Sequence, residues 1–125
     1  MKDFDYAKAR QFLEKKEEER ERFLNERYNQ ACEDFQKIVK KIIKEYHPTK
    51  IYQWGSLLNR EYFSEISDID IALEGITSAE EIFKIYGDIM NMTDFSVDLI
   101  QLEKIKPEFA ELIKTKGKIV YERGR

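Results

Sequence analysis

Three aspartates occupy sequence contexts in which a carboxylate is unusual. Asp68 and Asp70 alternate with isoleucines in the segment 68–73, and Asp98 interrupts an apolar run at 97–100. Aspartate is disfavoured in β-strands, and a charge inside an apolar strand is costly unless it is paired or binds a metal. Carboxylate oxygens are the ligands that suit Mg²⁺ and Mn²⁺. The three aspartates are therefore candidate metal ligands.

The spacing of these aspartates predicts how they could meet. Because successive side chains of a strand point to opposite faces, Asp68 and Asp70 would share one face, and the intervening apolar residues would face the core. If the strand that contains Asp98 pairs beside this one, all three carboxylates come together. Such a trio can hold two metals about 3.5–4 Å apart for in-line phosphoryl displacement. The open alternative is a solvent-facing edge strand whose aspartates bind nothing.

Gly55 and Ser56 form a second candidate element. They follow the β-branched and aromatic segment 50–54, which is typical of a strand, and they precede a segment that could start a short helix. A glycine lets a phosphate approach the backbone, and a helix N-terminus offers free N–H groups. The Ser56 hydroxyl adds a donor. Taken alone, the pair is equally well explained as an ordinary turn.

The elements that must position these residues are predicted from helix-forming composition, apolar periodicity and the positions of Pro and Gly. Residues 3–46 contain neither Pro nor Gly, which favours one long helix or two with a bend. The sequence predicts an α/β (α+β) fold with a small mixed sheet of about four strands flanked by helices. The remaining expected elements are a strand at 50–54, a short helix or turn plus loop at 57–66, a strand at 68–73, a helix from 77 or 78 to about 90, a strand at 95–102, a helix at about 107–115 and a strand at 118–122.

Helical periodicity also predicts which side chains face the core. Residues 14–22 are charged throughout, and apolar residues are sparse before residue 30. We therefore expect an N-terminal helical extension at 1–30 and a globular domain at 31–125. The expected core-facing positions are Ala31, Phe35, Ile38, Val39, Ile42, Ile43 and Tyr46 in the first helix and Ile82, Phe83, Tyr86, Ile89 and Met90 in the second.

Composition excludes several classes of function. The chain has 125 residues, which is the size of one domain, and a net charge of −3, which argues against a general nucleic-acid binder. Cys32 is the only cysteine, so neither an intrachain disulfide nor a cysteine-based metal site is expected. No apolar stretch reaches membrane-spanning length, and the N-terminus is unlike a signal peptide. A cytoplasmic location without a membrane is expected.

The combined pattern resembles a known superfamily. Trp54-Gly55-Ser56, the segment Ser67–Ile71, and Val97-Asp98-Leu99 look like the nucleotidyltransferases related to DNA polymerase β; eleven residues separate Ser56 from Asp68. More narrowly, the chain is similar to the minimal nucleotidyltransferases encoded beside HEPN-domain proteins in prokaryotic toxin–antitoxin modules. The resemblance covers roughly residues 32–122. It implies a polymerase β-like nucleotidyltransferase fold for the globular domain.

The resemblance also implies roles and cofactors. The family binds a nucleoside triphosphate, here expected to be ATP, with two Mg²⁺ ions, for which Mn²⁺ can substitute. It transfers the nucleoside monophosphate to a hydroxyl and releases pyrophosphate. Where the family commonly has an Arg-Gly pair after Gly-Ser, this chain has Arg60 followed by Glu61. The residues implied are Gly55, Ser56, Arg60 and Ser67 for the nucleotide and Asp68, Asp70 and Asp98 for the metals and catalysis.

Three functions remain open at this point. The first is an enzyme that transfers AMP to a partner protein, since the chain shows no segment that would bind a sugar, drug or RNA acceptor. The resemblance implies that this acceptor is a tyrosine of a HEPN-domain toxin, which the modification silences. The second is a non-catalytic antitoxin that neutralises its partner by contact, for which the sparse apolar stripe on residues 4–28 is suited. The third is a small-molecule nucleotidyltransferase that works as a homo-oligomer joined through its N-terminal helices.

Overall fold

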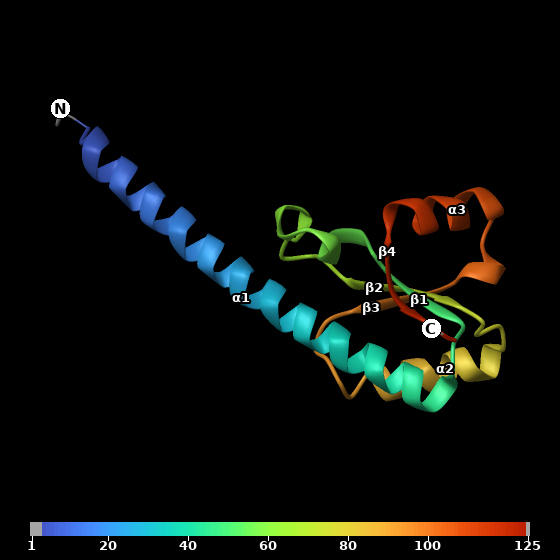
Figure 1. Ribbon diagram of the computed structural model, residues 1–125. Coiled ribbons are helices and arrows are strands. Elements are labelled where there is room, and N and C mark those ends of the chain that lie inside the picture. Colours follow the sequence, from blue (N-terminus) through green and yellow to red (C-terminus); the bar gives the residue numbers. More distant parts are fainter. Residues whose placement is uncertain (1–3, 125) are drawn as a thin grey trace.

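Helix α1 (Tyr6–Tyr46) is one uninterrupted helix that runs out from the body of the molecule (Figure 1). The computed structural model describes residues 4–124. Asp5 caps the start of α1, because its carboxylate accepts a hydrogen bond of 3.0 Å from the backbone N–H of Lys8. His47 ends the helix in the left-handed conformation, with φ 53°, and Pro48 follows, which cannot continue a helix.

A mixed four-stranded sheet forms the centre of the domain, in the order β3-β2-β1-β4. Strand β1 pairs antiparallel with both β2 and β4, whereas β2 and β3 run parallel. The strands are β1 (Lys50–Trp54), β2 (Ile69–Glu74), β3 (Val97–Gln101) and β4 (Lys118–Glu122). The other elements are α2 (Ala79–Ile89), α3 (Pro107–Lys116) and the 3₁₀ segments η1 (Gly55–Leu58), η2 (Arg60–Tyr62) and η3 (Leu102–Lys104). The predicted fold class and element order are confirmed.

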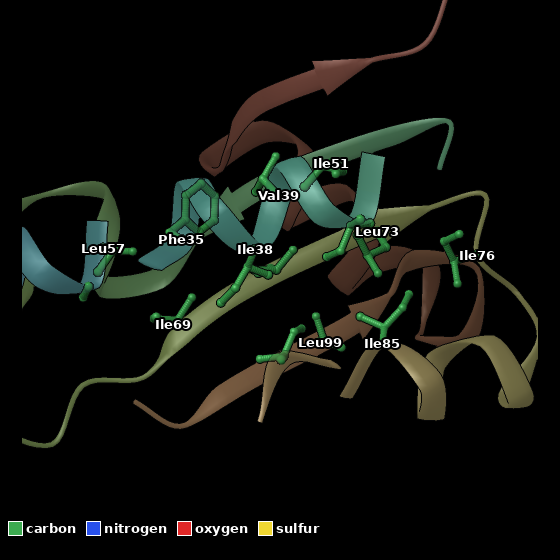
Figure 2. Packing of buried hydrophobic residues seen from close by; sticks show 14 of the residues in the cluster. Phe35, Ile38, Val39, Ile51, Leu57, Ile69, Leu73, Ile76, Ile85 and Leu99 are labelled. Atoms are coloured by element: carbon green, nitrogen blue, oxygen red, sulfur yellow. The ribbon is translucent and has the colours of Figure 1, made fainter. Parts of the chain in front are cut away.

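The second half of α1 and helix α2 cover one face of the sheet (Figure 1). On β2, Ile69, Ile71 and Leu73 are fully buried against these helices, as the alternation of the strand predicts. Figure 2 shows the isoleucines of this core converging from the helices and strands. The buried residues of α1 in this core are Ala31, Phe35, Ile38, Val39 and Ile42, with Ile43 and Tyr46 packed partly buried against them.

Helix α3 covers part of the opposite face. There Ala72 of β2 is fully buried beneath Ala110 and Ile113 of α3, in a smaller cluster that also contains Tyr52. Two residues before Ala72, on the same face of β2, stands Asp70. The sheet therefore presents an apolar half under α3 and an acidic half beside it on one face.

The core-facing side of α2 differs from the prediction at two positions. Ile82, Ile85 and Ile89 are buried, which follows the i, i+3, i+7 spacing of a single stripe. Phe83 and Met90 lie off this stripe and are 71% and 76% exposed. Their assignment to the core was wrong. Because α2 has apolar residues on more than one side, more than one set of positions follows the helical period, and the pattern alone does not show which set faces the sheet.

The first half of α1 makes few contacts with the domain. Every side chain from residue 6 to residue 23 is at least partly exposed, and the first buried one is Leu24. The helix runs without a break through residues 30 and 31, where the sequence places the boundary between extension and domain; that boundary stays a prediction. No helix within residues 4–124 is long and apolar enough to cross a membrane.

Candidate active site

Asp70 and Asp98 lie side by side on neighbouring parallel strands. The register of β2 and β3 places the two residues directly opposite each other. Directly opposed residues of adjacent strands point to the same face, and here they lie on the part of that face that α3 leaves uncovered. The predicted pairing of the strand with Asp98 beside the strand with Asp70 is therefore confirmed.

Asp68 lies just outside strand β2 rather than within it. The ladder begins at Ile69, whose backbone N–H donates to the carbonyl of Ser96 at 2.9 Å. Asp68 is exposed, one residue before this point. The strand predicted to begin at residue 68 thus begins one residue later, and Asp68 reaches the site from the end of the loop.

The two other carboxylates change the acidity of Asp70. Burial, together with the negative charges of Asp98 and Asp68, raises the pKa of Asp70 from its ordinary 3.8 to about 6. Like charges placed this close oppose one another's ionisation, so the arrangement favours a proton or a cation between them. The electrostatics therefore couple the three aspartates that the sequence grouped.

The absence of a side chain at Gly55 leaves room for the carboxylate of Asp70. A Cβ atom on Gly55 would lie 2.2 Å from Oδ2 of Asp70, and Gly55 has φ +79°, in the left-handed region. Both observations require glycine at this turn between β1 and η1. Ser56 follows within η1, half-buried. The structure thus brings the Gly-Ser turn against Asp70, although the two are far apart in the sequence.

Arg60 points toward helix α1. Its Nη2 atom forms an ion pair of 3.2 Å with Glu21, its Nε donates to Oδ1 of Asn25 at 2.5 Å, and its Nη1 donates to the carbonyl of Phe63 at 3.5 Å. These contacts fasten the loop between Ser56 and Asp68 to the middle of α1. The structure does not bring the Arg60 guanidinium together with the aspartates in this conformation.

Ser67 has a local role in the same loop. Its hydroxyl oxygen accepts a hydrogen bond of 2.8 Å from the backbone N–H of Ser64. The backbone N–H of Ser67 in turn donates to the carbonyl of Ser64 at 3.2 Å. Ser67 therefore closes the turn that delivers Asp68 to the start of β2, and the assignments of Ser67 and Arg60 to the nucleotide stay predictions.

Asp34, which was not among the residues predicted from the sequence, holds the segment before β3 against α1. It is 6% exposed, and it accepts hydrogen bonds from Gln30 at 2.9 Å and from the hydroxyl of Thr93 at 2.7 Å. The Thr93 hydroxyl accepts from the backbone N–H of Phe95, which lies just before β3. Asp34 thus ties α1 to the segment that leads to Asp98. Its signal was a carboxylate within the apolar stripe of α1.

The donor set fits divalent metal ions. Carboxylate oxygens are hard ligands. Burial is the main cause of the raised pKa of Asp70, and the charges of Asp98 and Asp68 add to it a repulsion that a cation would relieve. Among residues 4–124, however, no three His, Cys, Asp or Glu side chains are already gathered into a metal-binding group. The residues present therefore match divalent cations in the chemistry of their side chains.

Stability of the metal-free protein should depend on pH through Asp70. A group whose pKa is raised in the folded state stabilises the fold when protonated, and this contribution is lost as pH rises from the ordinary pKa of 3.8 through about 6. We expect a loss of about 1–2 kcal/mol, after allowance for solvent screening. Urea unfolding with EDTA at about pH 4.5 and about pH 7.5 measures it. Asp70→Asn should remove this part of the pH dependence; an unchanged dependence would contradict the assignment.

Comparisons with known proteins identify the family. The chain matches the family "Polymerase beta, Nucleotidyltransferase" over residues 36–125. No curated protein sequence matches the chain. The match begins within the second half of α1, so the exposed first half lies outside it.

Solved structures share the fold. A crystal structure of the toxin–antitoxin MntA–HepT matches with a TM-score of 0.55 and 22% identity, over 71% of this chain and 70% of that chain. A mutant of the pair matches with a TM-score of 0.59 and 22% identity, over 72% and 74%. A toxin–antitoxin structure with AMP-PNP matches with a TM-score of 0.56 and 23% identity, over 70% and 73%. These likenesses show the shared fold. The family match over residues 36–125 shows that the chain belongs to the polymerase β-like nucleotidyltransferase family.

Proposed function

We propose that the protein is a Mg²⁺-dependent nucleotidyltransferase that transfers AMP from ATP to a hydroxyl of a partner protein and so acts as an antitoxin. The observation that carries this proposal is the packing of Asp70 against both Asp98 and Gly55. Two motifs distant in sequence meet at one point, where one supplies carboxylates and the other supplies room for a phosphate. The family membership supplies the reaction class.

Each residue has a distinct task in this proposal. Asp68 and Asp70 would hold both cations, and Asp98 would hold the cation on the acceptor side. When bound, the cations neutralise charge on the phosphoryl group and on the leaving pyrophosphate. Asp98, which is exposed, accepts the proton of the attacking hydroxyl. Gly55 admits the triphosphate close to the backbone, and the Ser56 hydroxyl donates to it.

The proposed acceptor is a tyrosine of a HEPN-domain protein. The matched folds include the MntA–HepT toxin–antitoxin, which supports a protein acceptor. A toxin–antitoxin match contains AMP-PNP, which supports ATP as the nucleotide. Asp70 and Asp98 also lie on the part of a sheet face that α3 does not cover, where a side chain from another protein could enter. A tyrosine hydroxyl from a partner would meet Asp98 there.

A transfer assay with two labels tests this proposal. The purified chain is mixed with Mg²⁺, a candidate HEPN-domain partner, and ATP labelled at either the α- or the γ-phosphate. We expect the α-label, and not the γ-label, to appear on the partner, and an Asp68→Ala/Asp70→Ala variant to transfer neither. Transfer of the γ-label would show a kinase instead. A stable complex without transfer of either label would support a contact antitoxin.

Arg60 provides a prediction about nucleotide binding. If Arg60 joins the triphosphate, it must leave Glu21, and an exposed ion pair of this kind contributes up to about 1 kcal/mol. Glu21→Gln should therefore tighten Mg·ATP binding by up to about fivefold, whereas Arg60→Ala should weaken it about tenfold. Isothermal titration calorimetry measures both.

A neighbouring ion pair supplies the control. Arg20 of α1 and Glu65 of the same loop lie 3.7 Å apart, so Glu65→Gln removes a link between the same elements without releasing Arg60. Glu65→Gln should leave the affinity for Mg·ATP unchanged. If Arg60→Ala leaves it unchanged as well, Arg60 serves only to hold the loop on α1.

A further inference from the structure

The first half of α1 runs out from the sheet (Figure 1), and near its inner end it is joined to the loop before β2 by the ion pairs Arg20–Glu65 and Glu21–Arg60. Phe12 and Phe23 on this segment are 60% and 50% exposed, while Leu24, one residue further, is 7% exposed. Helical residues 6–23 also lie outside the region that matches the family. This arm therefore carries apolar side chains that no other part of residues 4–124 covers.

Phe12 and Phe23 lie on one stripe with charged residues between them, whereas the exposed Tyr6 and Leu13 lie off this stripe. Phe12, Lys16, Glu19 and Phe23 are spaced by four, three and four residues, the spacing of positions that share one face of a coiled-coil helix. All four are exposed. Lys16 lies over the ring of Phe12, with its Nζ 5.4 Å from the ring centre. The stripe thus reads apolar, basic, acidic, apolar from its N-terminal to its C-terminal end.

A stripe with this order is complementary to itself when it is reversed. In an antiparallel pair of arms, Phe12 meets Phe23 of the second copy, and Lys16 meets Glu19 of the second copy, twice by symmetry. Continuing the same register sets Ala9 against Glu26 and Asp5 against Gln30, so no like charges oppose each other along the stripe. A parallel pair in register would instead oppose Lys16 to Lys16 and Glu19 to Glu19.

We propose that the arm is a homodimerisation element that binds a second copy of this chain in antiparallel orientation through Phe12, Lys16, Glu19 and Phe23. Charge complementarity favours a second copy of this chain as the partner, because an antiparallel copy of the stripe sets acidic residues opposite basic ones. The register places the two sheet domains beyond opposite ends of the paired arms, with each set of aspartates on its own domain. This inference does not depend on the reaction that the site performs.

Charge exchange in the full chain tests the proposal. Sedimentation equilibrium of the wild type should give twice the monomer mass. Lys16→Glu and Glu19→Lys each replace two attractive contacts with two repulsive ones, so each should raise the dimer dissociation constant about tenfold or more. The double variant Lys16→Glu/Glu19→Lys restores both attractions in the antiparallel register and should return the constant to within about threefold of wild type.

Two controls separate pairing from helix stability. Glu14→Lys changes the same charge as Glu19→Lys on the opposite side of the arm, and it should leave the dimer intact. Circular dichroism should show the same helix content in all variants. A monomeric wild type, with or without a heterologous protein bound to the arm, would overturn the proposal. So would a dimer that tolerates the single variants, because its interface would lie elsewhere.

Discussion

Replacing Asp70 with asparagine should lower the rate of nucleotidyl transfer by about a thousandfold or more and should also stabilise the metal-free protein. The loss of rate corresponds to about 4 kcal/mol of transition-state stabilisation, which is the scale of an interaction with catalytic metals. The gain in stability follows from the pKa of Asp70, which burial and the charges of Asp98 and Asp68 raise to about 6. At neutral pH the native protein holds a carboxylate in a place that disfavours its charge, and asparagine removes that cost.

Single-turnover kinetics and thermal unfolding measure the two effects on the same sample. The unfolding temperature of Asp70→Asn in EDTA near pH 7.5 should rise by roughly 3–8 °C. Asp88→Asn is a matched control, because Asp88 lies in α2 and bonds to Tyr46 rather than to the aspartates. Asp88→Asn should retain the transfer rate. A variant of Asp70 that lost stability together with activity would show that the aspartate supports the fold rather than a cation.

Gly55→Ala should reduce transfer at least a hundredfold and destabilise the fold by about 1–3 kcal/mol. The new Cβ would stand 2.2 Å from Oδ2 of Asp70, and the left-handed φ of +79° already disfavours any side chain there. Either the turn or the carboxylate must move, and both belong to the proposed site. Transfer rate and urea unfolding report the two effects.

Two other glycines serve as controls that separate backbone strain from the collision with Asp70. Gly124 has a similar φ of +88° but open space around it, so Gly124→Ala carries the backbone strain without the collision. Gly87, inside α2, also has open space, so alanine there should stabilise the helix by about 0.5–1 kcal/mol. Both variants should keep full activity. If Gly55→Ala did so too, the contact with Asp70 would have no bearing on transfer.

Much of this fold could be predicted because its signals are local. Period-two alternation in 68–73 placed Ile69 and Ile71 in the core, and the period of the first helix placed Ile38 and Ile42 there. The adjacency of Asp70 and Asp98 needed one further assumption, that two successive strands around a helix pair side by side. That assumption holds often in α/β proteins, and it holds here.

The parts that could not be predicted depend on tertiary contacts. Nothing near Arg60 in the sequence indicates that Glu21 and Asn25, on a helix that ends before β1 begins, would hold its guanidinium. The close approach of the Asp70 carboxylate to Gly55 likewise depends on the antiparallel register of β1 and β2, which sets Trp54 opposite Asp70. Asp34 was overlooked because its partner Thr93 lies in a loop whose path the pattern does not define.

The most direct test of the account is a count of Mn²⁺ ions bound per chain, by electron paramagnetic resonance, in the presence of AMP-PNP. We predict about two ions per chain beyond those bound by the nucleotide in solution, because the carboxylates of Asp68, Asp70 and Asp98 would hold a pair. Asp70→Asn should abolish this binding, whereas Asp88→Asn should retain it. Mn²⁺ binding no greater than that of the nucleotide alone, or equal binding by Asp70→Asn, would contradict the account, because the three aspartates would then form no metal site.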